Sequence, residues 1–397
     1  MKIIHILGDS KFGGAAKSIV RLALLWKRLK WDVRILTTDL QFQEFAAASG
    51  VATVAVDCVW REIRPLQDLV GLFRLWRYLR AEGFTVVHTH TTKAGFVGRI
   101  AARLAGVPVV VHTVHGFAFH EQSPASKIAF YTALEWTAGW FCHCIITVSE
   151  FHRLWALRLR IASPEKIVAI PNGIPDGALE RGASREAVRQ ALGLGPDDLF
   201  LFTPGRVAPE KGLEELLMAV AVLPAEVRPH VQTVIAGDGP LLADLERRVA
   251  ELGIGGQVKF LGFRQDISDL LGACDIVALP SWREGLSISL LESMCAGRAI
   301  VASSIGSNLE ALDAAGPTGP VAMLVDAGDV PALAAAIGGL AADAALREDL
   351  GRRARAMWES RYTAEKALAQ YERTYVDLLR RQGHLEKQSA AIPAGSL

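Results

Sequence analysis

Residues 276–292 have the sequence IVALPSWREGLSISLLE and combine the two patterns from which the fold can be inferred. Ile276–Leu279 is a continuous apolar run, which is typical of a strand buried on both faces of a parallel sheet. A polar loop follows, and Gly285-Leu286-Ser287 then begins a helical segment that carries Glu292. This order of strand, loop and helix is the repeating part of a parallel α/β fold.

Strand and helix patterns alternate on both sides of this segment. In the first half the predicted strands are Lys2–Leu7, Val33–Thr37, Ala52–Val56, Thr85–His88, Pro108–Val114 and Cys144–Val148. In the second half the other predicted strands are Leu199–Thr203, Val231–Ala236, Val258–Leu261 and Ala299–Ala302. Helical patterns separate them, which predicts an α/β fold with two Rossmann-like, doubly wound parallel sheets.

The strand pattern is interrupted once, at Pro171-Asn172-Gly173-Ile174-Pro175 and the polar residues that follow. We therefore expect a first Rossmann-like domain over residues 1–175 and a second over residues 176–361. A final helix is expected over residues 362–383, and a disordered tail over residues 384–397. Ligands of α/β sheets bind at the carboxyl ends of the strands, so a crevice between the two domains is the expected active site.

The composition is that of a globular chain with two domains or slightly more. It has 397 residues, at about 150 per domain. Its hydrophobic fraction of 51% and charged fraction of 21% exclude a disordered chain. Residues 1–170 carry a net charge of +9 within a total of only +1. A basic first half suggests that it faces phosphates or an anionic surface, although solvated charges are the simpler alternative.

The cysteines fit a reducing compartment, and no apolar stretch has the features of a signal peptide or a clear membrane span. Five sparse cysteines make a poor disulfide framework, and we expect them to be buried free thiols. Ile3–Leu7 is too short for a signal peptide. Ile128–Val148 has the length of a membrane span but contains several polar residues, so we expect a buried helix followed by the strand at Cys144–Val148.

Two pairs of charged residues follow predicted strands of the second half. Arg206 and Lys211 follow its first strand, and an Arg fork with a Lys point charge suits a diphosphate. Glu284 precedes Gly285-Leu286-Ser287, where helix amides can hold a phosphate. Glu292 lies further along that helix, where a carboxylate can accept hydrogen bonds from ribose hydroxyls. The alternative is that all four residues are solvated surface charges.

Other motifs are less specific. Gly13-Gly14 after the first strand can cradle a phosphate or form a tight turn. Gly237-Asp238-Gly239-Pro240 lacks the third glycine of a dinucleotide fingerprint, and a turn with Pro at the first helical position explains it. His115-Gly116, at a strand end, can contact a ligand hydroxyl or serve only the turn. His88 and His90 could suggest a metal, but no third ligand accompanies them at a sensible spacing.

Taken in order, the motifs resemble those of family 4 glycosyltransferases, which have the GT-B fold of two Rossmann-like domains. The resemblance covers about residues 1–380 and rests on Gly13-Gly14, His115-Gly116-Phe117, Val148-Ser149, Ile170-Pro171-Asn172-Gly173-Ile174, Gly205-Arg206, Lys211-Gly212, Glu284 and Glu292. It implies retaining transfer of a sugar from a nucleotide-sugar, with UDP as the expected nucleotide. It also implies that the final helix crosses back to the first domain.

The resemblance implies a role for each site residue. His115 and Glu284 are the expected catalytic residues, with His115 near the reacting carbon and Glu284 on the sugar hydroxyls. Arg206 and Lys211 bind the diphosphate, which Gly14 approaches from the other domain. The remaining donor-binding residues are Gly285, Leu286 and Ser287 at the diphosphate and sugar, Glu292 at the ribose, and Leu261 and Phe263 beside the base.

The negative charge on the leaving diphosphate must be stabilised, either by a metal ion or by cations of the protein. The chain has no Asp-x-Asp, the metal motif of the other large glycosyltransferase fold. Arg206 and Lys211 can instead stabilise the developing negative charge. We therefore expect neither a metal nor a cofactor, the nucleotide-sugar being a substrate. Because Glu284 holds hydroxyls, we expect front-side departure assisted by the diphosphate rather than a carboxylate nucleophile.

Two further stretches indicate which kind of family 4 glycosyltransferase the chain resembles. Residues 89–95 and 112–117 resemble enzymes of bacterial surface-polysaccharide assembly, which implies a lipid-linked or glycan acceptor. Ser287-Ile288-Ser289 departs from the Pro-Asn-Ser of many relatives. The alternatives are a sugar-nucleotide 2-epimerase of the same fold and a non-catalytic scaffold of an envelope-assembly complex. A dinucleotide dehydrogenase is the least favoured, because no Gly-x-Gly-x-x-Gly follows either first strand.

A lipid-linked acceptor would require the protein to reach a membrane. The first half has basic residues beside apolar surface, namely Arg74, Arg77, Arg80, Arg99, Arg103, Arg153, Arg158 and Arg160. It also has aromatic residues between Phe117 and Trp140, a combination that suits an anionic interface. We therefore expect a cytoplasmic protein bound peripherally to the inner leaflet of the plasma membrane, with no nucleic-acid partner. The alternative, favoured for the helix around Trp136, is that these aromatic residues are core.

Overall fold

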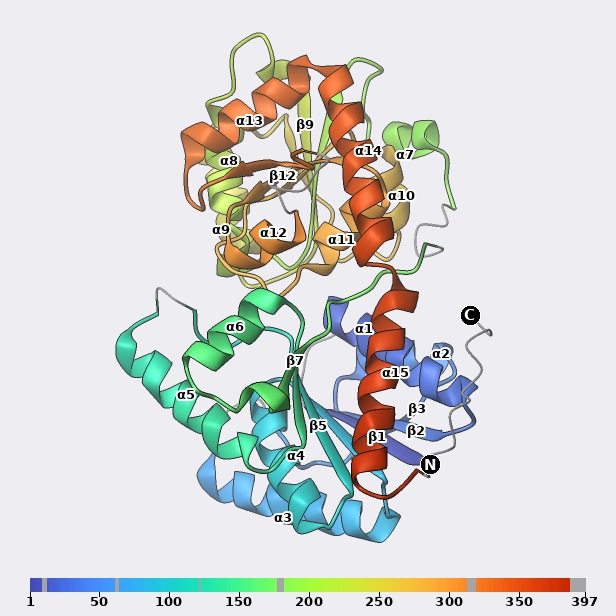
Figure 1. The fold of residues 1–397 in the computed structure, drawn as a ribbon. Coiled ribbons are helices and arrows are strands. Elements are labelled where there is room, and N and C mark those ends of the chain that lie inside the picture. Colours follow the sequence, from blue (N-terminus) through green and yellow to red (C-terminus); the bar gives the residue numbers. More distant parts are fainter. Residues whose placement is uncertain (9–12, 61–63, 121–122, 177–181, 313–318, 386–397) are drawn as a thin grey trace. The chain divides into compact units, whose positions relative to one another are not determined.

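The computed structural model describes residues 1–8, 13–60, 64–120, 123–176, 182–312 and 319–385. The chain divides into two compact units, residues 1–172 with 365–397 and residues 173–364. Each unit is built on one parallel sheet, which confirms the predicted fold class (Figure 1). Most of the tail predicted for residues 384–397 lies outside the described residues.

The sheet of the first unit has the strand order β3-β2-β1-β4-β5-β6-β7, and all its neighbouring pairs are parallel. Its strands are β1 (Lys2–Gly8), β2 (Asp32–Thr37), β3 (Ala52–Val54), β4 (Val86–His90), β5 (Val109–Val114), β6 (Cys144–Thr147) and β7 (Ile167–Ala169). The order reverses between β1 and β4. A ligand site of a doubly wound sheet is expected at such a reversal.

Helices cover both faces of this sheet (Figure 1). One face packs against α1 (Gly14–Arg28), α2 (Leu40–Ala48) and α15 (Ala364–Arg381). The other face is covered by α3 (Pro65–Glu82), α4 (Thr92–Leu104), α5 (Ala125–Gly139) and α6 (Glu150–Arg158). The last helix joins the first unit because Tyr371, Tyr375, Leu378 and Leu379 are buried in the same core as Trp26.

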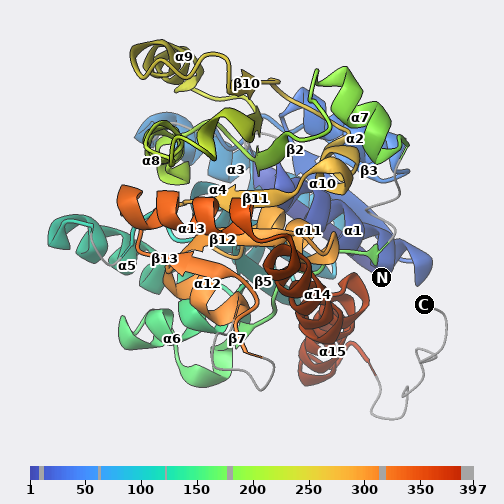
Figure 2. The same ribbon diagram turned by 90° about the horizontal axis from the view of Figure 1, so that it is seen from above.

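The second unit repeats this architecture with the strand order β10-β9-β8-β11-β12-β13. Its strands are β8 (Leu199–Pro204), β9 (Val231–Ala236), β10 (Val258–Phe260), β11 (Ile276–Leu279), β12 (Ala299–Ser303) and β13 (Met323–Val325). Its helices are α7 (Arg185–Ala191), α8 (Leu213–Ala221), α9 (Leu242–Glu251), α10 (Ile267–Ala273), α11 (Ile288–Cys295), α12 (Gly306–Ala311), α13 (Val330–Ala342) and α14 (Ala344–Arg361). Helices α8, α9 and α13 share one core, and α10 and α11 lie across the sheet from them (Figure 2).

Some features of the first unit correct the sequence analysis. Helix α5 was expected to be buried, but only Glu135, Ala138 and Gly139 of it are. Two of its three aromatic residues, Phe130 and Trp136, are exposed, with Trp136 at 50%. Arg99, expected on the basic surface, is fully buried and its guanidinium lies 2.7 Å from the Glu135 carboxylate. The buried ion pair fixes the helix by its one acidic residue and leaves Phe130 and Trp136 on its exposed side.

The lengths and compositions of the helices bear on whether the chain can cross a membrane. Among those described, no single helix is both long and apolar enough to cross a membrane. Helices α13 and α14 reach that length and composition only as a pair, with a bend of 105° between them.

Candidate active site

The carboxyl ends of β8 and β11 bring together the charged residues of the second unit. These strands are neighbours, and the chain leaves β8 toward β9 but leaves β11 toward β12 on the other side. The strand order therefore reverses here, where doubly wound sheets bind their ligands. Arg206 and Lys211 follow β8, while Glu284 and Ser287 follow β11.

The loop after β8 is held in place by a second glycine loop. Gly205 has φ of +143°, a conformation open to glycine, and its amide donates to the carbonyl of Ala236 at 3.0 Å. A Cβ on Gly237 would lie 1.7 Å from the Gly205 carbonyl oxygen, and one on Gly239 would lie 2.1 Å from that of Val207. The glycines of residues 237–239 thus allow close backbone packing. Contrary to prediction, Pro240 does not open the helix, because α9 begins at Leu242.

Arg206 and Lys211 each pair with a carboxylate. Arg206 is exposed and forms an ion pair with Glu210, four residues on. Lys211 Nζ lies 2.6 Å from Glu284 Oε1, and both side chains are less than a quarter exposed. Ser281 Oγ donates to the same carboxylate oxygen at 2.9 Å. Lysine, serine and glutamate from the ends of two strands therefore form one polar cluster.

The backbone around this cluster is tightly constrained. Gly212 has φ of +63°, and a Cβ there would lie 2.0 Å from the carbonyl oxygen of Pro280. The amide of Trp282 donates to the carbonyl of Glu210 at 2.9 Å, and Ser307 Oγ donates to that of Glu284 at 3.2 Å. These contacts fix the backbones of the two loops against each other.

Helix α11 begins beside the cluster. Ser287 is its N-cap, and the Ser287 hydroxyl accepts a hydrogen bond from the amide of Leu290 at 3.4 Å. Gly285 and Leu286 precede it, so the positive end of the helix dipole lies next to Lys211 and Glu284. This end of the unit can hold an anion through both backbone and side-chain groups.

The other predicted donor-binding residues of the second unit lie further out. Glu292 is half-buried on α11, one turn after its start. Leu261 and Phe263 follow β10, where the Leu261 amide donates to the carbonyl of Ile235 at 2.9 Å and Phe263 is 52% exposed. Strands β10, β9 and β8 are parallel neighbours, so their carboxyl ends lie at the same edge of the sheet. Leu261 and Phe263 are therefore at the same edge as Arg206.

The first unit holds the remaining predicted residues. Gly14 is the first residue of α1, next to the reversal between β1 and β4. His115 follows β5 and is half-buried, and burial lowers its pKa to about 4. His115 Nε2 lies 3.1 Å from His90 Nδ1. The expected approach of Gly14 and His115 to the donor stays a prediction.

Three histidines in the sheet of the first unit lie close enough together to be considered as a metal site. His5 joins His88 and His90, and ring nitrogens of all three lie within 4.8 Å of one another. This third histidine was not predicted because it lies 83 residues before His88, on another strand. However, both ring nitrogens of His88 have hydrogen-bonding partners, namely Tyr375 at 2.6 Å and Thr113 at 2.7 Å. The contacts are those of a hydrogen-bonded network, and the expected absence of a metal stays a prediction.

Two residues that contact Arg206 or Glu284, namely Glu210 and Ser281, were not among the predicted site residues, and Ser289 was noted only as a departure from relatives. Glu210 had a detectable signal, because an acid four residues after Arg206 is at ion-pair spacing. Ser281 lies three residues before Glu284 but had no recognisable pattern. Ser289 lies on α11 with its Oγ 4.0 Å from the place of a Cβ on Gly205. This proximity joins the loop after β8 to helix α11, which are far apart in the sequence.

Comparison with known protein families gives matches over both units. Residues 13–173 match the model of the glycosyl transferase 4-like domain, and residues 184–357 match the model of glycosyl transferases group 1.

Individual relatives are also glycosyltransferases. The chain is 34% identical over 314 residues to the Escherichia coli UDP-Gal:alpha-D-GlcNAc-diphosphoundecaprenol alpha-1,3-galactosyltransferase, covering 78% of this chain and 80% of the relative. It is 30% identical to the D-inositol 3-phosphate glycosyltransferase of Streptomyces scabiei, covering 90% and 85%. These relatives give no support to the 2-epimerase alternative.

Solved structures share the fold. The crystal structure of Anabaena Alr3699/HepE in complex with UDP-glucose superposes with a TM-score of 0.82 at 23% identity, covering 95% of this chain and 100% of that one. The sucrose-phosphate synthase of Thermosynechococcus elongatus has a TM-score of 0.79 at 21% identity, covering 96% and 100%.

Proposed function

This chain belongs to the group 1 glycosyltransferases and has the GT-B fold, and from this premise we propose the reaction that it catalyses. It transfers a sugar from a UDP-sugar to a lipid-linked acceptor, with retention at the anomeric carbon and without a metal ion. The observation that carries the proposal is the cluster of Lys211, Glu284 and the α11 N-terminus at the strand reversal of the second unit.

The first step of the reaction is departure of the nucleoside diphosphate. Lys211 Nζ and the start of α11 supply positive charge and N–H donors at one place, and Arg206 lies on the adjoining loop. Fixed groups of this kind stabilise the charge that develops as the C–O bond breaks. A diphosphate held by two cations and a helix N-terminus would not need a divalent metal to neutralise it.

Glu284 would change partners when the donor binds. Its carboxylate now accepts from Lys211 and Ser281. When Lys211 turns to the diphosphate, Glu284 is left with one hydroxyl donor and can accept hydrogen bonds from hydroxyls of the sugar. Glu292 would receive the ribose, Phe263 and Leu261 the base, and His115 the sugar near the reacting carbon.

The acceptor is proposed from the E. coli relative, whose acceptor is an undecaprenol-linked GlcNAc diphosphate. A lipid-linked acceptor stays in the membrane, so the protein would bind peripherally to the inner leaflet from the cytoplasm. The exposed side of the first unit supports this placement. Helix α3 exposes Leu66, Leu69, Val70 and Phe73, and α5 exposes Phe130 and Trp136, with Trp140 just beyond it.

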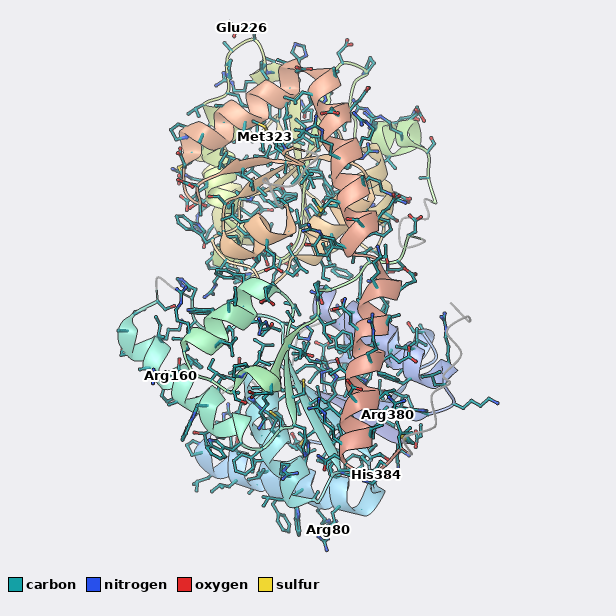
Figure 3. All side chains as sticks on the ribbon, viewed as in Figure 1. Arg80, Arg160, Glu226, Met323, Arg380 and His384 are labelled. Carbon is teal, nitrogen blue, oxygen red and sulfur yellow. The ribbon has the colours of Figure 1, made fainter. Side chains whose placement is uncertain are left out.

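Basic residues lie beside these apolar ones. Arg74, Arg77 and Arg80 are exposed on α3, and Lys127, Arg158 and Arg160 are exposed on or near α5 and α6. Arg80 and Arg160 are labelled in Figure 3. Each Lys or Arg near an anionic leaflet contributes about 1 kcal/mol of binding, so this set supports reversible attachment.

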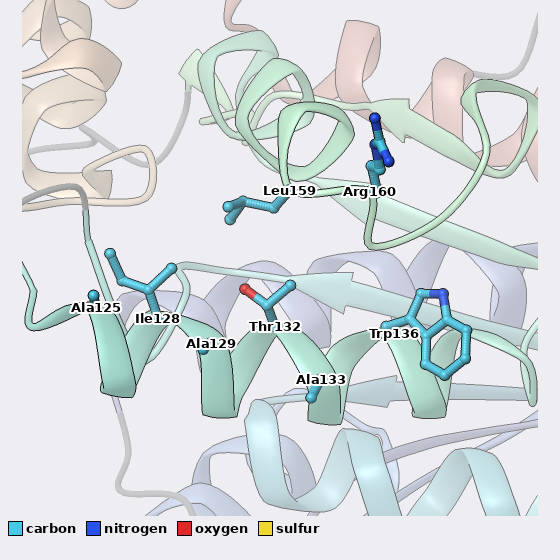
Figure 4. A pocket seen from close by; sticks show the side chains of 8 residues that line it. All are labelled: Ala125, Ile128, Ala129, Thr132, Ala133, Trp136, Leu159 and Arg160. Atoms are coloured by element: carbon cyan, nitrogen blue, oxygen red, sulfur yellow. The ribbon is translucent and has the colours of Figure 1, made fainter.

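A groove beside α5 adds to this surface. It has a volume of about 550 Å³ and is lined by Ala125, Ile128, Ala129, Thr132, Ala133, Trp136, Leu159 and Arg160. Ile128, Thr132 and Trp136 extend from α5 toward Leu159 and Arg160 (Figure 4). An apolar groove with one cation at its rim is suited to the boundary between acyl chains and headgroups.

Nucleotide binding tests the donor half of the proposal. Because a ligand that binds the folded state raises the melting temperature, UDP and UDP-sugars should stabilise the protein more than GDP or ADP do. Stabilisation by UDP should persist in EDTA and should be lost in Lys211→Met. Stabilisation only in the presence of Mn²⁺ or Mg²⁺, or none by any nucleotide, would contradict the proposal.

Flotation with liposomes tests the membrane half. The protein should float with anionic vesicles at low salt and be released at high salt. The double variant Trp136→Glu/Trp140→Glu should float less, whereas the matched control Val222→Glu, at an exposed valine of the second unit, should behave like the unmodified protein. Equal flotation of both variants, or binding that salt does not change, would contradict this surface.

A further inference from the structure

Three histidines of the first unit are joined end to end through their ring nitrogens. His5 Nδ1 lies 3.2 Å from His90 Nε2, and His90 Nδ1 lies 3.1 Å from His115 Nε2. The rings of His5 and His90, and those of His90 and His115, are stacked within 5.4 Å of each other. We call His5, His90 and His115 the imidazole chain.

The strand register explains why these residues meet. β1 pairs with β4 and β4 pairs with β5, with His5 opposite His88 and His90 opposite Thr113. Side chains two residues apart point to the same face of a strand, so His88 and His90 share a face, and His115 follows two residues after Thr113. The chain thus runs across three adjacent strands to the carboxyl edge of the sheet.

Hydrogen-bond chemistry restricts the tautomers of the imidazole chain. Burial lowers the pKa of His5 to about 3 and that of His115 to about 4, and it lowers the pKa of His90 well below its usual value, so all three are neutral at pH 7. A neutral imidazole has one N–H and one lone pair. Each of the two contacts joins an Nδ1 to an Nε2, and it is a hydrogen bond only if one of its two nitrogens carries a proton. Both contacts meet this condition only when all three rings have the same tautomer.

The two ends of the imidazole chain differ in exposure, because His5 is fully buried and His115 is half-buried. His5 Nε2 is buried with no hydrogen-bonding partner among the described residues, so a proton has no exit there. The chain can therefore hold a tautomer but cannot conduct a proton through the sheet. At the other end His115 Nε2 is occupied by His90, and Nδ1 is likewise buried without a partner in the described part of the molecule, although the His115 side chain as a whole is half-buried.

The backbone next to His90 supports a fixed geometry. Thr91 has φ of +60° and ψ of +159°, a region that residues other than glycine rarely adopt. Such a conformation persists only where the surroundings impose it, and it is commonest at functional sites. Here it turns the chain from β4 into α4 immediately after His90.

We propose that His5 and His90 are positioning residues for His115: the imidazole chain fixes one orientation and one tautomer of that ring and leaves Nδ1 to meet a hydroxyl of the substrate. The proposal rests on the proposed function only in naming the substrate, because the coupling of the three rings is a property of the first unit. His88 forms a separate branch, with Thr113 and Tyr375 as its partners.

Two substitutions of His90 separate the two links. Asn places its amide near the position of Nδ1, so His90→Asn keeps a partner for His115 and loses the one for His5. Gln reaches the position of Nε2, so His90→Gln does the reverse. His112→Asn is the matched control, since His112 is equally buried in β5 but bonds to Thr89 and not to the imidazole chain.

The readouts are the nitrogen NMR spectrum of histidine-labelled full-length protein and steady-state transfer kinetics. In the unmodified protein His5, His90 and His115 should have one common tautomer. In His90→Gln the His115 ring should become a tautomer mixture and kcat should fall on the order of tenfold with little change in the donor KM. His90→Asn and His112→Asn should keep a single His115 tautomer and most of the activity.

Several results would overturn the proposal. Unlike tautomers along the chain, an unchanged His115 ring in His90→Gln, or a stoichiometric metal that shifts the His5, His88 and His90 signals would each do so. Failure of the proposed function has a different signature. If the protein transfers no sugar, the NMR spectra still decide whether the three rings are coupled.

Discussion

Lys211 is expected to act both in catalysis and in stability, because its ammonium group pairs with a partly buried carboxylate. The Nζ–Oε1 distance to Glu284 is 2.6 Å, and the two side chains are 20% and 15% exposed. In Lys211→Met the Glu284 carboxylate keeps only the Ser281 hydroxyl of these two donors. Loss of a buried partner costs about 1–3 kcal/mol, and the free energy of unfolding should fall by that amount.

The double variant Lys211→Met/Glu284→Gln separates the effect of Lys211 on stability from its effect on catalysis. Gln removes the unpaired negative charge, so stability should recover by most of the lost amount, with a coupling energy of about 0.5–3 kcal/mol. Activity should not recover, because the diphosphate still lacks its cation. The rate of sugar transfer should stay on the order of 100-fold or more below normal in both variants.

The assay combines urea unfolding with transfer kinetics on the same preparations. Stability and activity that recover together in the double variant would refute the reasoning, because Lys211 would then act only as the partner of Glu284. A near-normal rate in the single variant would remove Lys211 from the site altogether.

The other predictions concern the donor site and the buried histidines. Arg206→Ala should lower turnover on the order of 100-fold with little effect on stability, since Arg206 is exposed; unchanged turnover would exclude it. Glu292→Gln should weaken UDP binding about tenfold by calorimetry, as expected for a lost hydrogen bond to a charged group. Turnover should be unchanged by excess EDTA, and a loss restored by Mn²⁺ would contradict the role of the two cations. Acid should destabilise the first unit, because the unfolded chain binds a proton at His5 below pH about 6.5 and the folded chain does so only near pH 3. At pH 5 this one histidine lowers the free energy of unfolding by about 2 kcal/mol, and His5→Phe should reduce the acid sensitivity measured by urea unfolding.

Sequence periodicity was sufficient for most of the sheet strands and not for two short ones. The apolar runs at Lys2–Leu7 and Ile276–Leu279 are continuous, and buried parallel strands require this. Strands β7 and β13 have three residues each and are partly exposed, and the sequence analysis did not identify them. They exist because the neighbouring strands β6 and β12 offer free edges for pairing.

The helix around Trp136 shows where composition misleads. Its apolar residues predicted burial, whereas Glu135 is buried and Trp136 exposed. The decisive contact is with Arg99, which lies 36 residues away on α4. No local pattern reports a pairing over that distance, and the same holds for His5 with His90 and for Lys211 with Glu284.

Transfer of labelled sugar to a lipid-linked acceptor tests the central claim most directly. The protein is incubated in EDTA with GlcNAc-diphosphoundecaprenol and each of UDP-galactose, UDP-glucose and UDP-GlcNAc, and the lipid product is extracted and its new linkage determined. We predict that at least one donor gives a lipid product with an α linkage and that Lys211→Met loses it. A β-linked product, a product that forms only with added metal, or a 2-epimer of the donor formed without acceptor would contradict the account.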